Sequence, residues 1–209
     1  YSKNLGSIDV STVLSKSSNV GAGKIALALD KQQLWQSMDR LGFGRQVATG
    51  FPGEVAGQLS HHRRWAQIDQ ATLSFGYGIS VTTLQLAQAY ATLANDGVFV
   101  PATLLKRDIP TRGHRVYSQS SASTVRRMLE SVVQADGTAP DAAVLGYRVA
   151  GKTGTVKKFG PDGYSDDRYL SLFAGMAPAR DPRVVMVVML DEPRAGKFYG
   201  GQVAGPVFS

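Results

Sequence analysis

The stretch Val184-Val185-Met186-Val187-Val188-Met189-Leu190 is an unbroken apolar run near the end of a 209-residue chain. It is the last of three strand-like runs that follow Gly146, where the hydrophobic period changes from 3.6 to 2. A strand that is apolar on both faces needs a covering layer on each side. We therefore expect residues 184–190 to be almost fully buried in a helix–sheet–helix sandwich.

The neighbouring segments complete a sheet. The three predicted strands are Tyr147–Lys158, Tyr169–Ala177 and Arg183–Asp191. Asp181-Pro182 separates the second strand from the third, so these two strands should form an antiparallel hairpin. Residues 146–209 are thus expected to form a sheet lobe, and their last five residues resemble the first turn of a helix.

Residues 1–145 have the pattern of a mainly helical lobe. Helices are predicted from a cap at Ser11 to Lys16, from Val20 to Leu29, after a capping box formed by Asp30 and Gln33, from about Ser80 to Asp96, and from about Ser121 to Ala135. The predicted buried stripes are Leu86, Tyr90 and Leu93 in the fourth helix and Val125, Met128 and Val132 in the fifth, whose surface carries Arg126, Arg127 and Glu130. The fold class is α/β of the α+β type, with an antiparallel sheet covered by helices on both faces plus a helical lobe.

Composition narrows the function classes. Lys and Arg number 23 against 16 Asp and Glu, but this net charge of +7 is scattered, which favours a solvated surface over nucleic-acid binding. The chain has no cysteine, which excludes disulfides and thiol catalysis. His61, His62 and His114 lack the spacing of metal ligands, so we interpret them as loop residues and expect no metal site.

The strand motif Lys152-Thr153-Gly154-Thr155 has a coherent chemistry. An ammonium beside two hydroxyls suits the docking of a carboxylate, and a glycine lets a substrate backbone approach. Lys152 and Thr155 lie on opposite faces of an ideal strand, so both reach one ligand only if it lies along the strand edge. The backbone N–H of Thr155 would then be free for an oxyanion hole. The alternative is an ordinary strand with an exposed lysine and a glycine at a bulge.

The second motif, Ser17-Ser18-Asn19, lies at a break between two predicted helices. Alone, this Ser-x-Asn pattern fits helix capping equally well. Its value comes from its combination with Lys-Thr-Gly, because Ser-x-x-Lys, Ser-x-Asn and Lys-Thr-Gly together are the signature of penicillin-binding proteins and class A β-lactamases.

Further segments resemble class B penicillin-binding proteins, especially the division-specific septal transpeptidases of the penicillin-binding protein 3 type. The segments that carry this resemblance, besides the two motifs, are residues 51–54 (FPGE), 76–78 (GYG), 81–91 (VTTLQLAQAYA), 147–151 (YRVAG), 173–178 (FAGMAP) and 200–208 (GGQVAGPVF). They cover nearly the whole chain in the order of the family. The resemblance implies a serine β-lactamase/transpeptidase-like fold.

One element of the signature is absent. No lysine of the chain has a serine three residues before it, so the nucleophile motif Ser-x-x-Lys does not occur. In the family this motif precedes Ser-x-Asn, and the chain begins at Tyr1 rather than Met, so we expect a partial domain whose nucleophile lies upstream. Alone, such a fragment is expected to be inactive. No membrane span is predicted within it, because its longest apolar run is far shorter than the ~20 residues that a spanning helix needs.

The resemblance implies a D,D-transpeptidase that binds the D-Ala-D-Ala end of a peptidoglycan stem peptide through an acyl-serine intermediate. Ser17 would transfer a proton, Asn19 would bind the substrate backbone, and Lys152, Thr153 and Thr155 would hold the terminal carboxylate. The aromatic side chains of Phe198, Tyr199 and Tyr77 are further candidates for the site, with loop packing as the alternative for each.

The same resemblance implies β-lactams as inhibitors, no metal or organic cofactor, and other division and cell-wall membrane proteins as partners. It places the intact protein in the bacterial inner membrane, with its catalytic domain in the periplasm. A D,D-carboxypeptidase and an inactive division scaffold stay open. A class A β-lactamase is disfavoured, because no glutamate is followed by asparagine four residues later. The sharpest geometric prediction is that Ser17 Oγ and Lys152 Nζ lie within hydrogen-bonding reach.

Overall fold

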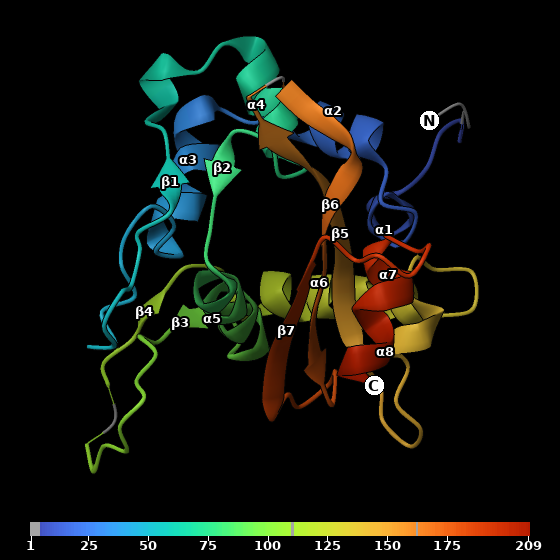
Figure 1. The fold of residues 1–209 in the computed structure, drawn as a ribbon. Coiled ribbons are helices and arrows are strands. Elements are labelled where there is room, and N and C mark those ends of the chain that lie inside the picture. Colours follow the sequence, from blue (N-terminus) through green and yellow to red (C-terminus); the bar gives the residue numbers. More distant parts are fainter. Residues whose placement is uncertain (1–4, 110, 162) are drawn as a thin grey trace.

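The computed structural model describes residues 5–109, 111–161 and 163–209. Its main sheet contains β5 (Ala150–Gly160), β6 (Gly163–Ala177) and β7 (Val184–Asp191) in that order, all antiparallel (Figure 1). Lys152 lies opposite Ala174 in the register, and Ala174 lies opposite Val187. The three predicted strands and the hairpin between the second and the third are therefore confirmed.

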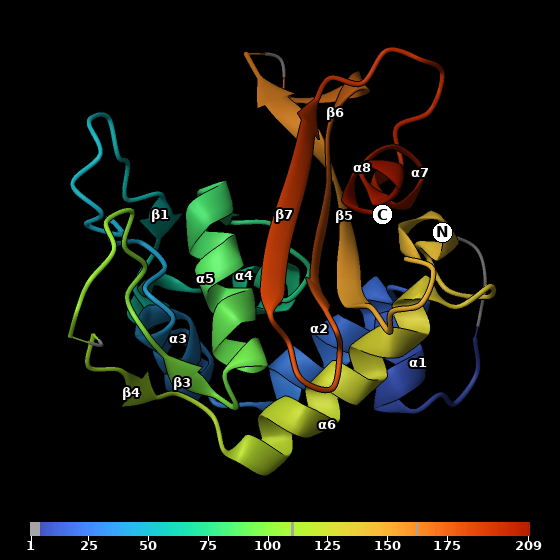
Figure 2. The same cartoon turned by 90° about the horizontal axis from the view of Figure 1, so that it is seen from below.

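Helices cover both faces of this sheet (Figure 2). The helices α5 (Thr83–Ala94) and α6 (Gln119–Glu130) lie on one face, where the buried Met176 of β6 packs in one cluster with Leu129. The short helices α7 (Gly200–Val203) and α8 (Gly205–Phe208) lie on the other, where the ring of Phe173 meets that of Phe208 edge-on at 4.9 Å. The predicted helix–sheet–helix arrangement is confirmed.

The predicted burial of the apolar strand is wrong. Val184 is 55% exposed, Met186 40% and Met189 48%. The physical reason is that β7 is an outer strand of the described sheet and that α8, with four residues, is too short to cover its length. Only Val185, Val188 and Leu190 pack against the two core clusters.

The remaining elements all precede the sheet in the sequence. They are α1 (Val10–Ser15), α2 (Asn19–Ala28), α3 (Lys31–Arg40), β1 (Gln58–Leu59), η1 (His62–Arg64), α4 (Gln67–Leu73), β2 (Ile79–Ser80), β3 (Val98–Phe99), β4 (His114–Arg115), η2 (Ser131–Val133) and η3 (Pro140–Ala142). Strand β1 pairs with β2, and β3 with β4, both antiparallel. Among the described residues, no helix is long and apolar enough to cross a membrane.

Two predicted surface residues of α6 are buried instead. Arg126 is 7% exposed and donates to Leu93 O at 2.6 Å and to Asp96 Oδ1 at 2.8 Å. Glu130 is 9% exposed and accepts from Arg148 Nε at 2.6 Å. A helical pattern cannot distinguish a solvated charge from one that is paired inside the protein, because both side chains are polar.

Local capping is partly as predicted. Asp30 caps α3, its carboxylate accepting from the backbone of Gln32 at 2.8 Å. Helix α1 is capped by Asp9 rather than Ser11. The predicted loop histidines lie instead in or beside short elements: His61 caps η1, His62 opens it, and His114 belongs to β4.

Candidate active site

The turn between α1 and α2 presents Ser17 to solvent. Ser17 has a φ of 52°, a left-handed conformation that is uncommon outside glycine. Ser18 follows as the N-cap of α2, and its hydroxyl accepts from Gly21 N at 3.1 Å. A Cβ on Gly21 would lie 2.5 Å from a methyl of Val13, so only glycine lets α2 approach α1 this closely. The tight junction holds Ser17 outward, in a strained geometry of the kind that clusters at functional sites.

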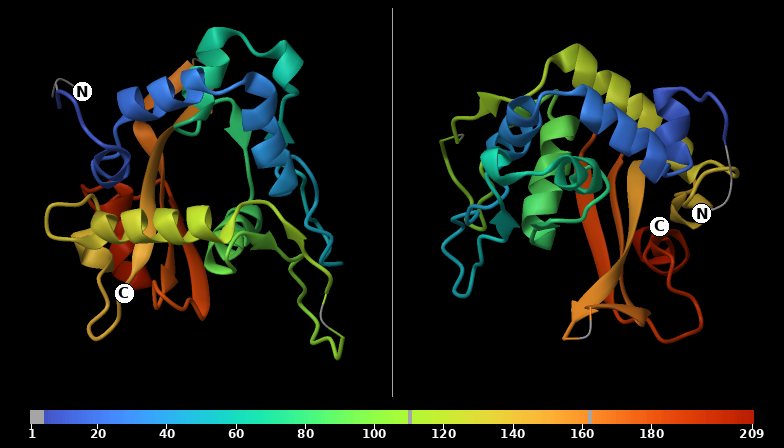
Figure 3. Two further views of the ribbon diagram at one scale, coloured as in Figure 1. Left: turned by 180° about the vertical axis from the view of Figure 1, so that it is seen from behind. Right: turned by 90° about the horizontal axis from the view of Figure 1, so that it is seen from above.

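The turn is tied to the sheet through the loop after η2. Lys16 Nζ lies 3.1 Å from Asp136 Oδ2 and also donates to the backbone oxygen of Asp136. Two residues later, Thr138 Oγ1 lies 3.1 Å from Thr153 Oγ1 on β5. One short loop therefore contacts both the Ser17 turn and the Lys-Thr-Gly strand (Figure 3).

Ser17 and Lys152 meet as predicted. Lys152 Nζ donates to Ser17 Oγ at 2.8 Å across 135 residues of sequence. The same ammonium lies 3.2 Å from the backbone oxygen of Thr153 and 3.3 Å from its Oγ1. Side chains alternate along a strand, so Lys152 and Thr153 start on opposite faces. The lysine side chain therefore bends around the strand, which brings its ammonium to both Ser17 and Thr153. Strand β5 is the outer strand on that side of the described sheet, which leaves its edge open for this.

The electrostatics of the site favour an anion. Among the described residues no carboxylate forms an ion pair with Lys152, and burial lowers the pKa of its ammonium to about 8. A partly desolvated ammonium without a carboxylate partner is stabilised by any anion that docks beside it. Because an ammonium only donates, Ser17 Oγ accepts in their hydrogen bond and keeps its own proton free to donate.

Thr155 connects the strand to the predicted aromatic loop. Its Oγ1 accepts from Gly200 N at 3.0 Å, which leaves its hydroxyl proton free to donate to a ligand. Phe198 and Tyr199 precede that glycine, and their rings lie 4.5 Å apart. Phe198 also stacks on Tyr169 of β6 at 4.2 Å. Both predicted aromatic residues therefore lie beside the Thr155 end of the motif.

Gly154 serves a packing role that the sequence did not reveal. A Cβ at this position would come within 2.8 Å of the Leu172 side chain on the neighbouring strand. Leu172 lies opposite Gly154 in the register and fills the space that a side chain would take. The glycine is thus required for the close packing of β5 against β6, whatever a substrate also demands.

Among the described residues, neither Asn19 nor Tyr77 forms a hydrogen bond with Ser17 or Lys152. Asn19 is exposed at the first position of α2, two residues after Ser17. Tyr77 is half-buried near the other end of β5, with its ring 5.4 Å from that of Tyr164. Lys16, Asp136 and Thr138 were missed, because single polar residues in turns carry no pattern that separates them from solvated ones.

A family model described as the penicillin binding protein transpeptidase domain matches residues 1–209. The chain belongs to this family. It is 47% identical to the peptidoglycan D,D-transpeptidase FtsI of Escherichia coli K12, over 94% of the chain and 33% of that protein. It is 44% identical to the probable peptidoglycan D,D-transpeptidase PenA of Neisseria meningitidis, over 97% of the chain and 35% of that protein. The chain thus spans about a third of the length of these relatives.

Solved structures support the same family and fold. The apo transpeptidase domain of Burkholderia pseudomallei penicillin-binding protein 3 matches the whole chain with a TM-score of 0.95 and 47% identity, and the chain covers 63% of it. Penicillin-binding protein 3 of Mycobacterium tuberculosis in complex with aztreonam matches 95% of the chain with a TM-score of 0.88 and 37% identity, covering 49% of that structure. The predicted family and fold class are therefore confirmed.

Proposed function

We propose that the protein containing this chain is a peptidoglycan D,D-transpeptidase that cross-links stem peptides in septal cell-wall synthesis through an acyl-serine intermediate. The observation that carries this proposal is the 2.8 Å contact between Lys152 Nζ and Ser17 Oγ, which joins two motifs that are 135 residues apart. The names of the relatives support the reaction class. The acylated serine is proposed to come from a Ser-x-x-Lys motif outside this chain.

The chemistry assigned to the site begins with the ligand carboxylate. Lys152 supplies the charge that holds it, and the hydroxyls of Thr153 and Thr155 donate to its oxygens. The attacking serine forms a bond to the penultimate D-Ala carbonyl, the backbone N–H of Thr155 stabilises the resulting oxyanion, and the terminal D-Ala leaves as an amine.

Ser17 completes the proton path. Its Oγ accepts from the Lys152 ammonium, and its hydroxyl proton passes to the departing D-Ala amine. The general-base lysine of the Ser-x-x-Lys motif, which takes the proton of the attacking serine, returns that proton to Ser17. Asn19 is proposed to bind the backbone amide of the stem peptide. In the second half of the reaction an amine of a neighbouring stem attacks the acyl-serine and restores the enzyme.

The broader setting is part of the same proposal. A β-lactam presents a similar carboxylate and a strained amide, so it is proposed to trap the same serine. The aztreonam complex of a structural relative is consistent with this. The proposal needs no metal or organic cofactor, and it places the intact protein in the inner membrane with its catalytic domain in the periplasm, beside other division and cell-wall synthesis proteins.

The test uses the full-length protein. Fluorescent penicillin should label it covalently, and a stem peptide with an added acceptor amine should give a cross-linked product. Free tetrapeptide as the sole product would indicate a carboxypeptidase. Absence of labelling in folded full-length protein would contradict acyl-serine chemistry and favour a scaffold role.

A further inference from the structure

A ligand docked at Lys152–Thr155 has one open direction along the strand. Ala150 and Gly151 precede the motif and are buried, Ala150 in one core cluster with Leu129 of α6. The positions that follow Thr155 are half-buried or exposed as far as Gly160. A stem peptide held by its carboxyl end must therefore extend along β5 toward its hairpin with β6.

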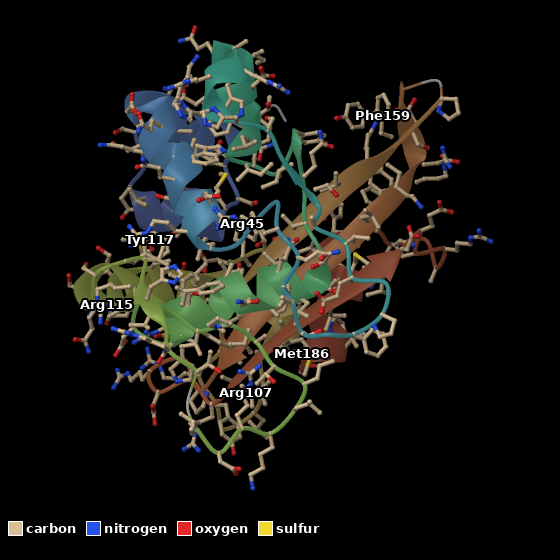
Figure 4. All side chains as sticks on the ribbon, turned by 90° about the vertical axis from the view of Figure 1, so that its left-hand side faces the viewer. Arg45, Arg107, Arg115, Tyr117, Phe159 and Met186 are labelled. Carbon is tan, nitrogen blue, oxygen red and sulfur yellow. The ribbon has the colours of Figure 1, made fainter. Side chains whose placement is uncertain are left out.

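Aromatic side chains lie at the end of that path. Phe159 on β5 is 73% exposed and Tyr164 on β6 is 53% exposed. The Tyr164 ring meets Phe159 edge-on at 5.2 Å on one side and Tyr77 at 5.4 Å on the other. Tyr77 comes from the segment between α4 and β2, so the three rings, here called the aromatic platform, join the hairpin to the helical part. Figure 4 shows Phe159 at the far end of the twisted hairpin.

The platform is held in place by an irregularity in the hairpin. The register of β5 against β6 shifts between Lys157 and Phe159, which turns the tip relative to the rest of the sheet. Lys158 Nζ lies 2.8 Å from both Asp191 and Glu192 at the end of β7, and Lys157 Nζ lies 2.6 Å from Asp166. These ion pairs anchor the tip and pair its two lysines with carboxylates, while the rings of Phe159 and Tyr164 stay exposed.

We propose that the aromatic platform binds the amino sugar to which the stem peptide is attached. This inference rests on the proposed transpeptidase function. The five residues of an extended stem pentapeptide span at most about 17 Å, and the four steps from Thr155 to Phe159 rise by about 13 Å along a strand. The N-terminal end of a stem whose carboxyl end is docked at the motif therefore reaches the platform.

The chemistry of the platform suits a neutral sugar. A pyranose ring presents an apolar face of C–H groups, which stacks on an exposed aromatic ring, while its hydroxyls and acetamido oxygen need donors at the rim. The exposed guanidinium of Arg168 lies beside the tip, where its Nη2 would be 3.0 Å from a Cβ on Gly160, and it can supply those donors. Exposed aromatic surface on the strand that carries the candidate site is typical of a ligand-binding groove.

The test compares two substrates with the full-length protein. One is a free stem pentapeptide and the other is the same peptide carried on its disaccharide, and kcat/KM for D-Ala release is measured for both. We expect the wild type to prefer the sugar-linked substrate, and Phe159→Ala with Tyr164→Ala to reduce that preference about five- to tenfold, the range that follows from loss of about 1–1.5 kcal/mol of ring stacking. Phe51→Ala is a matched control, since Phe51 is 65% exposed in a different turn and should leave the preference unchanged.

Each outcome decides the inference. An equal loss with both substrates would show that the platform binds peptide rather than sugar, and no loss with either would show that it does not contact substrate; both overturn the proposal. Melting curves of the variants establish that the exposed substitutions leave the fold intact, and Phe159→Tyr, which keeps a ring, should retain the preference. Failure of the wild type to react with penicillin or with either substrate would instead contradict the underlying transpeptidase function.

Discussion

Lys152 and Lys158 lie six residues apart on the same strand, but they differ in their ion pairs and in the direction of their pKa shifts. Lys158 Nζ lies 2.8 Å from the carboxylates of both Asp191 and Glu192, and its hydrogen bonds to them raise its pKa. Lys152 forms no ion pair with a described carboxylate, and burial lowers its pKa to about 8. The fold neutralises Lys158 with two carboxylates, whereas Lys152 has no described carboxylate partner.

The difference teaches how to separate structural from functional charges on one element. A paired surface lysine stabilises the fold by a small amount. Burial of a lysine costs desolvation free energy, which contacts with hydroxyl and carbonyl oxygens alone offset only in part. Such a lysine is more typical of a functional site than of the structural framework. The two lysines therefore predict opposite consequences of mutation.

The largest expected effect is that of Lys152→Ala in the full-length protein. A charge-assisted hydrogen bond is worth about 1.5–3 kcal/mol, so acylation by penicillin should slow roughly ten- to a hundredfold. The melting temperature should stay close to that of the wild type, because no carboxylate loses its partner. Lys152→Arg should recover part of the rate, since it keeps the charge in a different geometry. Time courses of fluorescent-penicillin labelling and a melting curve measure both.

The pH dependence sharpens the same assignment. With a pKa of about 8, Lys152 is an ammonium below that pH and loses its charge as the pH rises through it. Second-order acylation by a carboxylate-bearing β-lactam should therefore fall above pH 8, approaching the Lys152→Ala rate. Lys152→Arg should lack this decline up to pH 10, because guanidinium stays charged. An identical decline in the arginine variant would assign the titration to another group.

A smaller effect is expected from Thr138→Val. The substitution keeps the shape of the side chain but removes the oxygen that lies 3.1 Å from Thr153 Oγ1. Loss of one neutral hydrogen bond costs about 1 kcal/mol, so acylation should slow about fivefold. Thr138→Ser, which retains the hydroxyl, is the control and should restore most of the rate.

The smallest catalytic effect is expected at the paired lysine. Lys158→Met should lower the melting temperature only slightly, by about 2–4 °C or less. Its effect on acylation should be far smaller than that of Lys152→Ala, and Lys158→Arg should keep the stability. A tenfold loss of acylation in a folded Lys158→Met variant would remove the contrast between the two lysines.

Sequence reasoning succeeded where the signal is periodic or is a known motif. The three strands, the hairpin at Asp181-Pro182 and the convergence of Ser17 with Lys152 were predicted correctly. It failed where position in the sheet or pairing decides burial. The apolar pattern of residues 184–190 could not reveal that β7 is an outer strand of the described sheet.

The residues around the site show the same limit. The sequence pattern of α6 places Arg126 on the surface. It does not reveal that Arg126 pairs with Asp96, which lies on the segment after α5. Lys16 and Asp136 pair across 120 residues, and no local pattern encodes such a contact. The Phe159–Tyr164 pair depends on a register shift, which is set by the folded hairpin rather than by alternation along either strand.

The most direct test of the central claim combines the Lys152→Ala variant with a β-lactam whose carboxylate is masked as a methyl ester. In the wild type, masking should slow acylation roughly ten- to a hundredfold, like the mutation. If Lys152 holds the carboxylate, the variant should react with the ester no more slowly than with the free acid, because the interaction is already absent. Two losses that multiply would show that the lysine and the carboxylate act independently, and would contradict the assignment of Lys152 as the carboxylate-binding residue.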